Sequence, residues 1–223
     1  MQYRNEVKHM ISPLDKAVLL SRLTRVMQRD SHTDEDGRYR VRSLYFDNVY
    51  DRALRDKQNG VSRREKFRIR YYDGDTSRIH LEKKVRQGGV GYKVSEAVTK
   101  DEAQRIVDGD VRWMALSGRP LLIELYARMK GEGLKPSTIV DYTRTPFVYA
   151  PGNVRVTIDE NIRTGLKCTD FLNPDAVTVP VGPDIVLEVK WDAFLPSCVR
   201  SAVRLQGVRA TAFSKYAVCR KFD

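Results

Sequence analysis

The residues best suited to chemistry in this sequence form a run of alternating basic side chains. Arg64, Lys66, Arg68 and Arg70 stand at every second position. Because side chains of a β-strand alternate between its two faces, these cations are expected on one face of a strand. Neighbours on such a face are only roughly 7 Å apart, so they repel one another. The pattern therefore predicts either a solvated surface or a binding site for a polyanion.

The chain then turns at residues 73–75 and returns as a second predicted strand. In this strand Glu82 and Lys84 share a face, and Leu81 and Val85 share the opposite one. The resulting hairpin has one apolar side and one side that is mostly cationic. A plain solvent-exposed face is expected to mix its charges, whereas this face has few acids, which favours the binding site.

Composition supports an anionic partner. The 223 residues include 40 Lys and Arg against 29 Asp and Glu, which gives a formal net charge of +11. Such an excess indicates nucleic acid, an anionic membrane surface or phosphate-rich small molecules. With 41% hydrophobic residues the chain can build a substantial core, and we expect residues 1–223 to form a single domain.

Other features of the sequence argue against several classes of protein. Cys168, Cys198 and Cys219 have no metal-ligand spacing, and the three histidines form no His-x-x-x-His pair, so a zinc site is not expected. The sequence has no long apolar run, and its first residues lack the apolar segment of a signal peptide. We therefore expect a cytoplasmic protein with reduced cysteines and no transmembrane segment, although a membrane partner is possible.

The remaining elements alternate between strands and helices. Strands are predicted over residues 3–9, 40–47, 138–145, 155–159 and 185–190, and a flexible turn over residues 87–91. Helices are predicted after Ser12, after the capping box that begins at Thr99, and over residues 120–129. Residues 48–59 are either irregular or helical. This order of elements favours an α+β fold over a β-sandwich.

Charged residues recur on one face of these predicted strands. They are Arg4, Glu6, Lys8, Lys66, Arg68, Arg70, Glu82, Lys84, Lys93, Arg144, Arg155, Glu188 and Lys190. A flat sheet would expose them to water, whereas a closed antiparallel barrel would enclose them in a wet, basic lumen that holds a polyanion. The few carboxylates would then suit Mg²⁺ or Mn²⁺, which prefer oxygen ligands and commonly bridge carboxylates to phosphates.

At this level the chain resembles the catalytic domain of the vacuolar transporter chaperone (VTC) family, a branch of the triphosphate tunnel metalloenzymes. The matching pieces are Arg4-Asn5-Glu6-Val7-Lys8, Leu44-Tyr45-Phe46-Asp47, Arg63-Arg64-Glu65-Lys66-Phe67-Arg68-Ile69-Arg70, Leu81-Glu82-Lys83-Lys84, Tyr142-Thr143-Arg144-Thr145-Pro146-Phe147, Val154-Arg155-Val156-Thr157-Ile158-Asp159, Leu187-Glu188-Val189-Lys190-Trp191 and Phe213-Ser214-Lys215-Tyr216. Each piece is weak alone, but the ordered set spans essentially the whole chain and is quite specific.

The resemblance implies an eight-stranded antiparallel β-barrel, the triphosphate tunnel, with peripheral helices. It also implies ATP-driven synthesis of inorganic polyphosphate. Its implied phosphate contacts are Lys8, Arg68, Arg70, Lys84, Lys93, Arg144, Arg155, Lys190 and Lys215, with Tyr142 and Ser214 also touching phosphate or nucleotide. The implied metal ligand is Glu188, for Mn²⁺ or Mg²⁺. We add Lys66 to the phosphate ligands from its place on the cationic face, and Glu82 and Glu6 as candidate metal ligands.

Alternatives remain open for several of these residues. Glu188 could instead pair with Lys190 or Arg155, and Glu6 and Glu82 could simply orient neighbouring cations. Ser214 could be a helix cap and Tyr142 a packing residue. Lys83 faces away from Lys84 on a regular strand, and a β-bulge would exchange the two.

Two departures from the family pattern are visible. Arg4 stands where the wider superfamily has Glu, which favours the VTC branch. Ala212 stands where the polymerase branch usually has a basic residue, so the resemblance implies one phosphate contact fewer in this chain.

Three functions follow in order of preference. The first is an ATP-dependent polyphosphate polymerase that acts on ATP and polyphosphate. The second is a hydrolase that cleaves tripolyphosphate or a nucleoside triphosphate at the same site. The third is a non-catalytic module that binds polyphosphate or nucleic acid. Nucleic acid is disfavoured because the aromatic residues Phe67, Tyr71 and Phe147 fall on the apolar face, where they cannot stack on bases.

Overall fold

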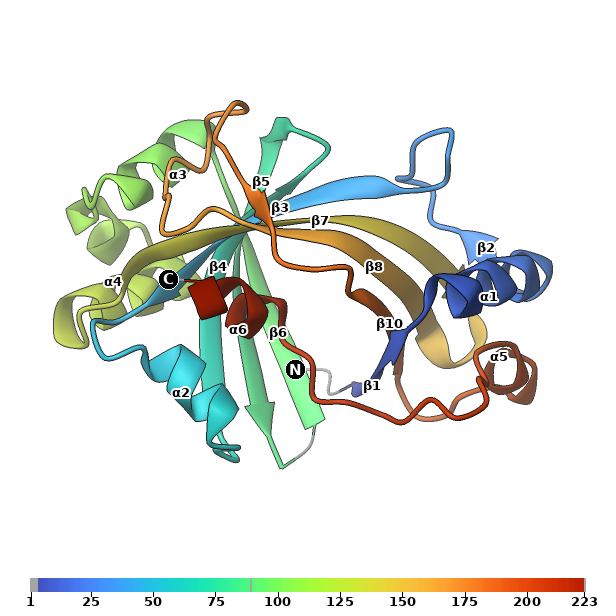
Figure 1. The fold of residues 1–223 in the computed structure, drawn as a ribbon. Coiled ribbons are helices and arrows are strands. Elements are labelled where there is room, and N and C mark those ends of the chain that lie inside the picture. The colour runs from blue at the N-terminus through green and yellow to red at the C-terminus, as the bar shows by residue number, and fades with distance from the viewer. Residues whose placement is uncertain (1–3, 89, 223) are drawn as a thin grey trace. The chain divides into compact units, whose positions relative to one another are not determined.

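The structure is a computed structural model that describes residues 4–88 and 90–222. Helices accompany an antiparallel sheet (Figure 1). The strands are β1 (Asn5–Ile11), β2 (Gln28–Arg29), β3 (Tyr39–Asp47), β4 (Arg64–Tyr72), β5 (Asp75–Gln87), β6 (Val90–Val98), β7 (Lys135–Tyr149), β8 (Val154–Thr164), β9 (Val179–Pro180) and β10 (Ile185–Trp191). The α-helices are α1 (Pro13–Val26), α2 (Arg52–Gln58), α3 (Lys100–Val107), α4 (Pro120–Gly131), α5 (Ser197–Ala202) and α6 (Lys215–Cys219), with short 3-10 helices η1 (Arg112–Leu116), η2 (Pro151–Asn153) and η3 (Arg220–Phe222).

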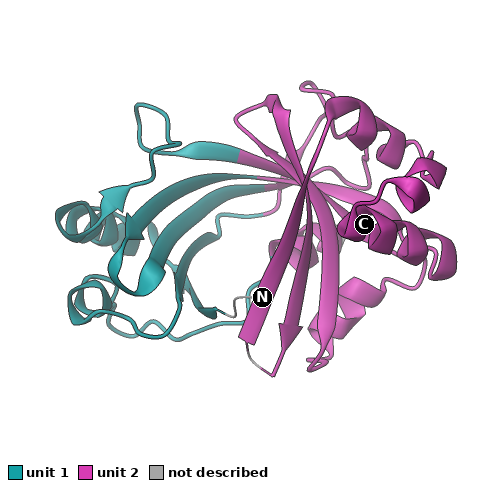
Figure 2. Ribbon diagram, turned by 180° about the vertical axis from the view of Figure 1, so that it is seen from behind, with its two compact units in different colours: residues 1–40, 142–162, 182–214 teal, residues 41–141, 163–181, 215–223 magenta. Residues whose placement is uncertain are grey.

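The strand order is β1-β10-β8-β7-β3-β4-β5-β6, with β2 paired to β7 and β9 paired to β8. The predicted fold class, an α+β fold with eight antiparallel strands and peripheral helices, is thus confirmed. The chain forms two compact units, shown in different colours in Figure 2. Unit 1 contains residues 1–40, 142–162 and 182–214, and unit 2 contains residues 41–141, 163–181 and 215–223. A single domain over residues 1–223 stays a prediction.

Unit 1 packs α1 and α5 with the apolar side chains of β1, β8 and β10. Helix α1 begins where the sequence predicts, because Ser12 forms a capping box with Asp15 and Pro13 occupies the first turn. Its buried residues Leu19 and Leu23 belong to the same core cluster as Val156 of β8. Burying such side chains fully contributes about 1.5–3 kcal/mol each, which fixes the strands that carry the charged residues on their other face.

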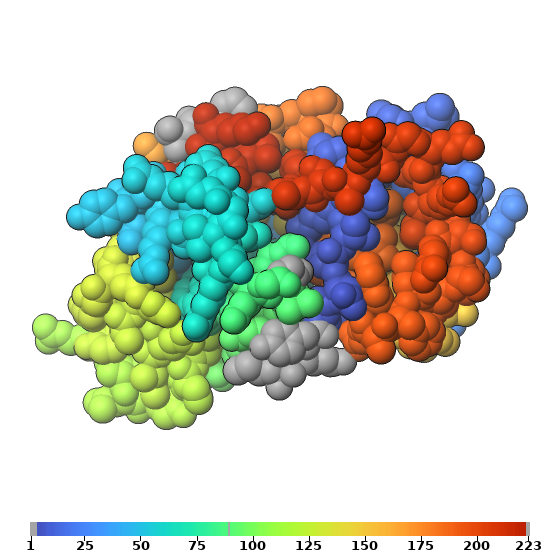
Figure 3. Space-filling view, turned by 90° about the horizontal axis from the view of Figure 1, so that it is seen from below, coloured from blue at the N-terminus to red at the C-terminus, as the bar shows by residue number. Residues whose placement is uncertain are grey.

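Unit 2 is built around the predicted hairpin of β4 and β5. Asp73 and Gly74, with φ of 50° and 76°, form the turn. The apolar face of the hairpin, including Phe67 and Leu81, packs in a core with residues of α3 and α4. Figure 3 shows the cyan segment of α2 beside the yellow-green segment of α4 on one face of this unit.

Several boundaries differ from the sequence prediction. Strand β7 extends over Lys135–Tyr149, beyond the predicted residues 138–145, because Phe147 continues the buried face past Pro146. Residues 48–59, for which the sequence left irregular and helical structure open, contain helix α2. Of the first predicted strand and the glycine turn, Tyr3 and Gly89 lie outside the described residues. Among the helices of the described ranges, none has the length and apolar character needed to cross a membrane.

Candidate functional site

The predicted cationic face of unit 2 is formed by three neighbouring strands. We call it the arginine cluster: Lys66, Arg68 and Arg70 of β4, Glu82 and Lys84 of β5, and Lys93 of β6. The strand register pairs Lys66 with Lys84, Arg68 with Glu82, and Lys84 with Lys93. Residues paired across antiparallel strands share a face, so the structure brings these residues together as predicted. Lys83 pairs with Phe67 on the opposite, apolar face, so no bulge exchanges it with Lys84.

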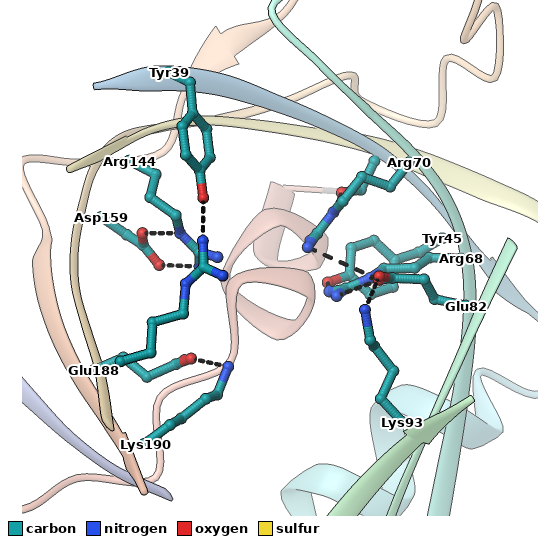
Figure 4. Close-up of polar contacts among 12 residues, drawn as sticks. Tyr39, Tyr45, Arg68, Arg70, Glu82, Lys93, Arg144, Asp159, Glu188 and Lys190 are labelled. Atoms are coloured by element: carbon teal, nitrogen blue, oxygen red, sulfur yellow. Dashed lines mark hydrogen bonds and ion pairs between the residues drawn. The ribbon is translucent and has the colours of Figure 1, made fainter. Parts of the chain in front are cut away.

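Glu82 is the carboxylate at the centre of this cluster (Figure 4). Arg68 donates to its Oε2 through Nε at 2.7 Å, Arg70 Nη1 lies 3.9 Å from the same oxygen, and Lys93 donates to Oε1. Glu82 is only 3% exposed. Burial alone would raise the pKa of Glu82, but Arg68, Arg70 and Lys93 hold it well below its usual range. These contacts fit the role of orienting cations, which was one of the two alternatives for this residue.

Two tyrosines, which the sequence analysis did not select as ligands, support the arginine cluster. Arg68 Nη1 donates to Tyr45 Oη at 2.9 Å, and the ring of Tyr45 stacks on that of Tyr216 with centroids 4.9 Å apart. Lys66 Nζ lies 5.0 Å from the centre of the Tyr216 ring. Burial would raise the pKa of Tyr45, but Arg68, Arg70 and Lys66 lower it to about 8. Burial also lowers the pKa of Lys66 to about 8.

Helix α6 begins at Lys215, a predicted phosphate ligand, and is held in unit 2 by buried polar contacts. Tyr216 is 1% exposed and its hydroxyl donates to Asp47 Oδ2 at 2.7 Å. Asp47 also accepts from the backbone N–H groups of Ala53 and Leu54 in α2, at 2.8 and 3.1 Å. One carboxylate therefore anchors the first turns of both helices.

A further arginine completes the attachment of α6. Arg220 donates to Tyr216 Oη at 2.8 Å, to Ser137 Oγ at 2.9 Å and to Asp51 Oδ1 at 2.8 Å. Because these contacts join α6 to β7 and to the segment before α2, they fix the position from which the Lys215 side chain extends.

In unit 1, opposite charges alternate across two paired strands. We call this group the glutamate–lysine quartet: Glu6 and Lys8 of β1, and Glu188 and Lys190 of β10. The register pairs Glu6 with Lys190 and Lys8 with Glu188. Lys8 Nζ lies 3.3 Å from Glu6 Oε1 and 3.2 Å from Glu188 Oε2. Lys190 Nζ contacts Glu188 and lies 3.9 Å from Glu6 Oε2.

The pKa values of the two lysines of the quartet shift in opposite directions, although both side chains contact the same carboxylates. Burial would lower the pKa of Lys8, but Glu188 and Glu6 outweigh it and hold the pKa above its ordinary value. For Lys190 burial dominates and lowers the pKa, although the same two carboxylates oppose the shift. Nearby Arg144 adds to the lowering for Lys190.

The two predicted arginines of unit 1 each have an acidic partner. Figure 4 shows that of Arg144, which is Asp159. Arg144 donates through Nε and Nη2 to Asp159 at 2.7 and 2.8 Å, and its guanidinium carbon lies 5.2 Å from the centre of the Tyr142 ring. Arg155 Nη2 donates to Asp30 Oδ2 at 2.7 Å and to Tyr39 Oη at 2.9 Å. Asp30 and Tyr39 were not predicted, since only the fold brings them to β8.

The predicted nucleotide contacts Tyr142 and Ser214 are placed in unit 1. Tyr142 is buried and packs beside Arg144, which fits the packing alternative, and its contact with phosphate or nucleotide stays a prediction. Ser214 is half-buried and directly precedes α6. Arg4, at the position that departs from the superfamily pattern, donates to Asp192 at 2.9 Å. The expectation that residues of both units line one channel stays a prediction.

A divalent metal would need oxygen ligands that are close together. Within residues 4–88 and 90–222, no group of three or more His, Cys, Asp or Glu side chains gathers in a position to hold a metal ion. Glu188 and Glu6 are largely buried and both contact Lys8, so their carboxylates lie near each other, and a metal site formed by them stays a prediction. Phosphate oxygens of a substrate would have to supply the remaining ligands. Glu82 fits less well because three cations already engage it.

Comparison with solved structures finds similar folds. The structure of HpAC1 from Hippeastrum, described as having a dominant triphosphatase activity, is similar with a TM-score of 0.59 and 15% identity, over 99% of this chain and 95% of that one. The PH1819 protein from Pyrococcus horikoshii matches at 12% identity over 97% of this chain and 95% of that one, with a TM-score of 0.48. No curated protein matches the chain at a significant level. The HpAC1 likeness shows a shared fold.

The family itself is shown by sequence. The family model described as the VTC domain matches residues 3–222, which is nearly the whole chain. This confirms the resemblance that the ordered motifs indicate, from the glutamate–lysine quartet of β1 and β10 to Lys215 of α6. The chain therefore belongs to the VTC domain family.

Proposed function

We propose that this chain is an ATP-dependent and metal-dependent polyphosphate polymerase. It would transfer the γ-phosphate of ATP to a growing chain of inorganic polyphosphate and release ADP. Membership of the VTC domain family supports the proposal. The observation that carries it is the arginine cluster, where Glu82 stands among the cations of β4, β5 and β6. An anion of several charges, such as a row of phosphoryl groups, would balance this excess.

The arginine cluster is suited to hold phosphates in fixed positions. Arginine can grip phosphate oxygens with two parallel hydrogen bonds, whereas lysine acts as a compact point charge. Glu82 and Tyr45 restrain the guanidinium of Arg68, and Ser43 Oγ accepts from Arg70 Nε at 2.9 Å. Restrained donors need little reorganisation when charge develops on the transferred group, which is the main requirement of phosphoryl transfer.

The cations of unit 1 are proposed as further phosphate ligands. These are Lys8, Arg144, Arg155 and Lys190, with Lys215 of unit 2 added from α6. Asp159 and Asp30 hold the two arginine guanidinium groups through hydrogen bonds, so these groups are positioned before substrate arrives. Pre-positioned charge lowers the ordering cost of binding.

The reaction needs no dedicated general base. An anionic oxygen of the terminal phosphate of the growing chain attacks the γ-phosphorus of ATP in line. The new P–O bond forms as the bond between the γ-phosphorus and the β–γ bridging oxygen breaks, and the electron pair leaves with ADP. Because the nucleophile is already deprotonated, the residues named above have to align phosphates and neutralise charge rather than move a proton.

The metal expected for this family would be held by Glu188, with Glu6 as the second carboxylate. Bound Mn²⁺ or Mg²⁺ would supply charge neutralisation at the phosphate oxygens. Lys8 and Lys190 contact these carboxylates and keep the pair compatible with burial. Glu188→Gln removes a charged oxygen ligand, so it should abolish metal-dependent turnover.

Incubation of the purified protein with ATP and Mn²⁺ tests the proposal. We expect long anionic polymer, visible on a urea gel, together with ADP. Arg68→Ala should abolish the polymer. Arg105→Ala should not, because Arg105 of α3 pairs with Asp110 and lies outside both the arginine cluster and the glutamate–lysine quartet. If the protein binds polyphosphate but turns over no ATP, the proposed enzymatic activity is wrong and the chain is a binding module.

Hydrolysis is the second candidate. It is favoured by the triphosphatase activity with which the similar structure HpAC1 is described. Water would then replace the terminal phosphate as nucleophile, and the same cations would bind the triphosphate. Orthophosphate release without polymer in the incubation would select this function over the first.

A further inference from the structure

Strand β8 presents two neighbouring hydrogen-bond donors that have no acceptor. Thr157 is 2% exposed, and its Oγ1 is buried without a hydrogen-bond partner among the residues that the structure describes. Arg155 Nε is likewise buried and without a partner in that part of the chain. The acceptors of Arg155, Asp30 and Tyr39, both bind its Nη2 instead. The inner edge of the guanidinium and the threonine hydroxyl therefore form a pair of open donors.

The strand register places both donors beside the glutamate–lysine quartet. Thr157 pairs with Glu188 and Arg155 pairs with Lys190. Paired residues share a face, so both side chains lie on the charged face of unit 1. Residues two apart on a strand have Cα atoms roughly 7 Å apart, so the two donors can be reached by different oxygen atoms of one phosphoryl group.

An acceptor is needed because open donors in a protein interior are unfavourable. A buried polar group without a partner costs about 1–3 kcal/mol, and native structures contain few of them. Glu188 is the nearest acidic residue in the register, and its carboxylate is engaged by Lys8 and Lys190. An incoming phosphoryl group offers several negatively charged oxygens and could satisfy both donors, and hydrogen bonds to charged acceptors are the stronger ones.

We propose that Thr157 is a further substrate-binding residue. Its hydroxyl and Arg155 Nε each donate to a non-bridging oxygen of the same phosphoryl group of a triphosphate or polyphosphate ligand. This inference rests on the proposed function and assigns a specific donor pair to it. On the same face the side chain of Lys190 is 28% exposed and can move to admit the ligand.

The test compares Thr157→Val with Thr157→Ser and uses inorganic tripolyphosphate as the probe. Isothermal titration calorimetry gives the affinity, and thermal unfolding of the ligand-free protein gives the stability. Valine keeps the branched shape and removes the hydroxyl, so we expect the Kd to rise roughly tenfold or more. The ligand-free Tm should stay the same or rise, because no hydrogen bond is lost. Serine keeps the hydroxyl, so its Kd should stay within about threefold of wild type.

Thr164→Val on the same strand is the matched control. Thr164 is 1% exposed, and its hydroxyl accepts from the backbone N–H of Leu166 at 3.2 Å. This substitution should lower the Tm and leave the tripolyphosphate Kd unchanged.

The possible outcomes distinguish a failure of the role of Thr157 from a failure of the proposed function. Wild-type binding with an unchanged Kd in Thr157→Val would overturn the role of Thr157 and leave the proposed function intact. A lowered Tm with an unchanged Kd would show that the hydroxyl has a structural partner such as an ordered water, which also overturns it. Absence of tripolyphosphate binding by the wild type would overturn the proposed function and this inference together.

Discussion

Replacing Glu82 with Gln should reveal how strongly the arginine cluster depends on a counter-charge. The substitution keeps the shape of a side chain that is 3% exposed but removes the charge that Arg68, Arg70 and Lys93 share. Breaking a buried ion pair typically costs 3–5 kcal/mol. Lys93 is 49% exposed, and glutamine still accepts hydrogen bonds, so we expect about 3 kcal/mol, from the low end of that range. For a chain of this size this corresponds to a Tm lowered by about 9 °C.

The same reasoning predicts that an anion replaces the missing charge. Tripolyphosphate at a hundredfold excess over its Kd stabilises a protein by about 2.7 kcal/mol if it binds only the folded state. In Glu82→Gln the ligand would also relieve repulsion among the cations, so its Tm should rise by more than that of wild type. We expect the gap between the two proteins to shrink by at least half in differential scanning fluorimetry.

The control and the pH dependence sharpen this test. Glu132→Gln alters a more exposed carboxylate that pairs with Arg128 and Arg52, so its effect on the free energy of unfolding should stay below about 1 kcal/mol.

Because the pKa of Glu82 in the folded state is depressed, the stability that its charge contributes is present above the unfolded-state pKa. This stability is lost as the pH falls through the folded-state pKa. The difference between wild type and Glu82→Gln should therefore close only in strong acid. Equal stability at neutral pH, or no larger response to tripolyphosphate, would refute the argument.

Three further predictions concern single contacts. Lys66, with a pKa lowered to about 8, is about half protonated at pH 8, and a bound polyanion favours its ammonium form. Tripolyphosphate binding at pH 8 should therefore take up protons. Calorimetry in buffers of different ionisation enthalpy should show less proton uptake for Lys66→Met than for wild type, and equal uptake would contradict this role of Lys66. Tyr216→Phe removes the 2.7 Å hydrogen bond to Asp47 and should lower the urea unfolding free energy by about 2 kcal/mol; an unchanged midpoint would argue against a role in docking α6. Asp159→Asn leaves the buried Arg144 guanidinium without its charged partner and should cost about 3–5 kcal/mol in the same assay, whereas a loss below 1 kcal/mol would mean that the pair contributes little.

Local rules predicted the framework well. The period of two in β4 and β5 correctly separated Arg68 and Arg70 from the buried Phe67 and Ile69. The helix cap at Ser12 and the capping box at Thr99 occur where the sequence predicts them, because each depends only on residues three apart in the chain. The cationic face of the arginine cluster followed from the same periodicity, since β4 and β5 are neighbours in sequence as well as in the sheet.

The partners of the charged residues were harder to predict, because they depend on distant segments. Asp30 precedes Arg155 by more than a hundred positions in the sequence, and only the folded unit places its carboxylate at the guanidinium. Tyr45 was part of a recognised motif, but its stacking on Tyr216 requires α6 to dock. Neither contact has a local spacing that a sequence pattern could reveal.

The shared use of Asp47 by α2 and α6 has a practical consequence for handling the protein. Because the same carboxylate caps the backbone of Ala53 and Leu54 and accepts the Tyr216 hydroxyl, the last helical segment is mechanically tied to an earlier one. A tag, truncation or surface tether that strains the residues after Lys215 would also loosen the opening turn of α2. Attachments for purification or immobilisation are therefore better placed on the exposed loop around Asp36, which lies outside this linkage.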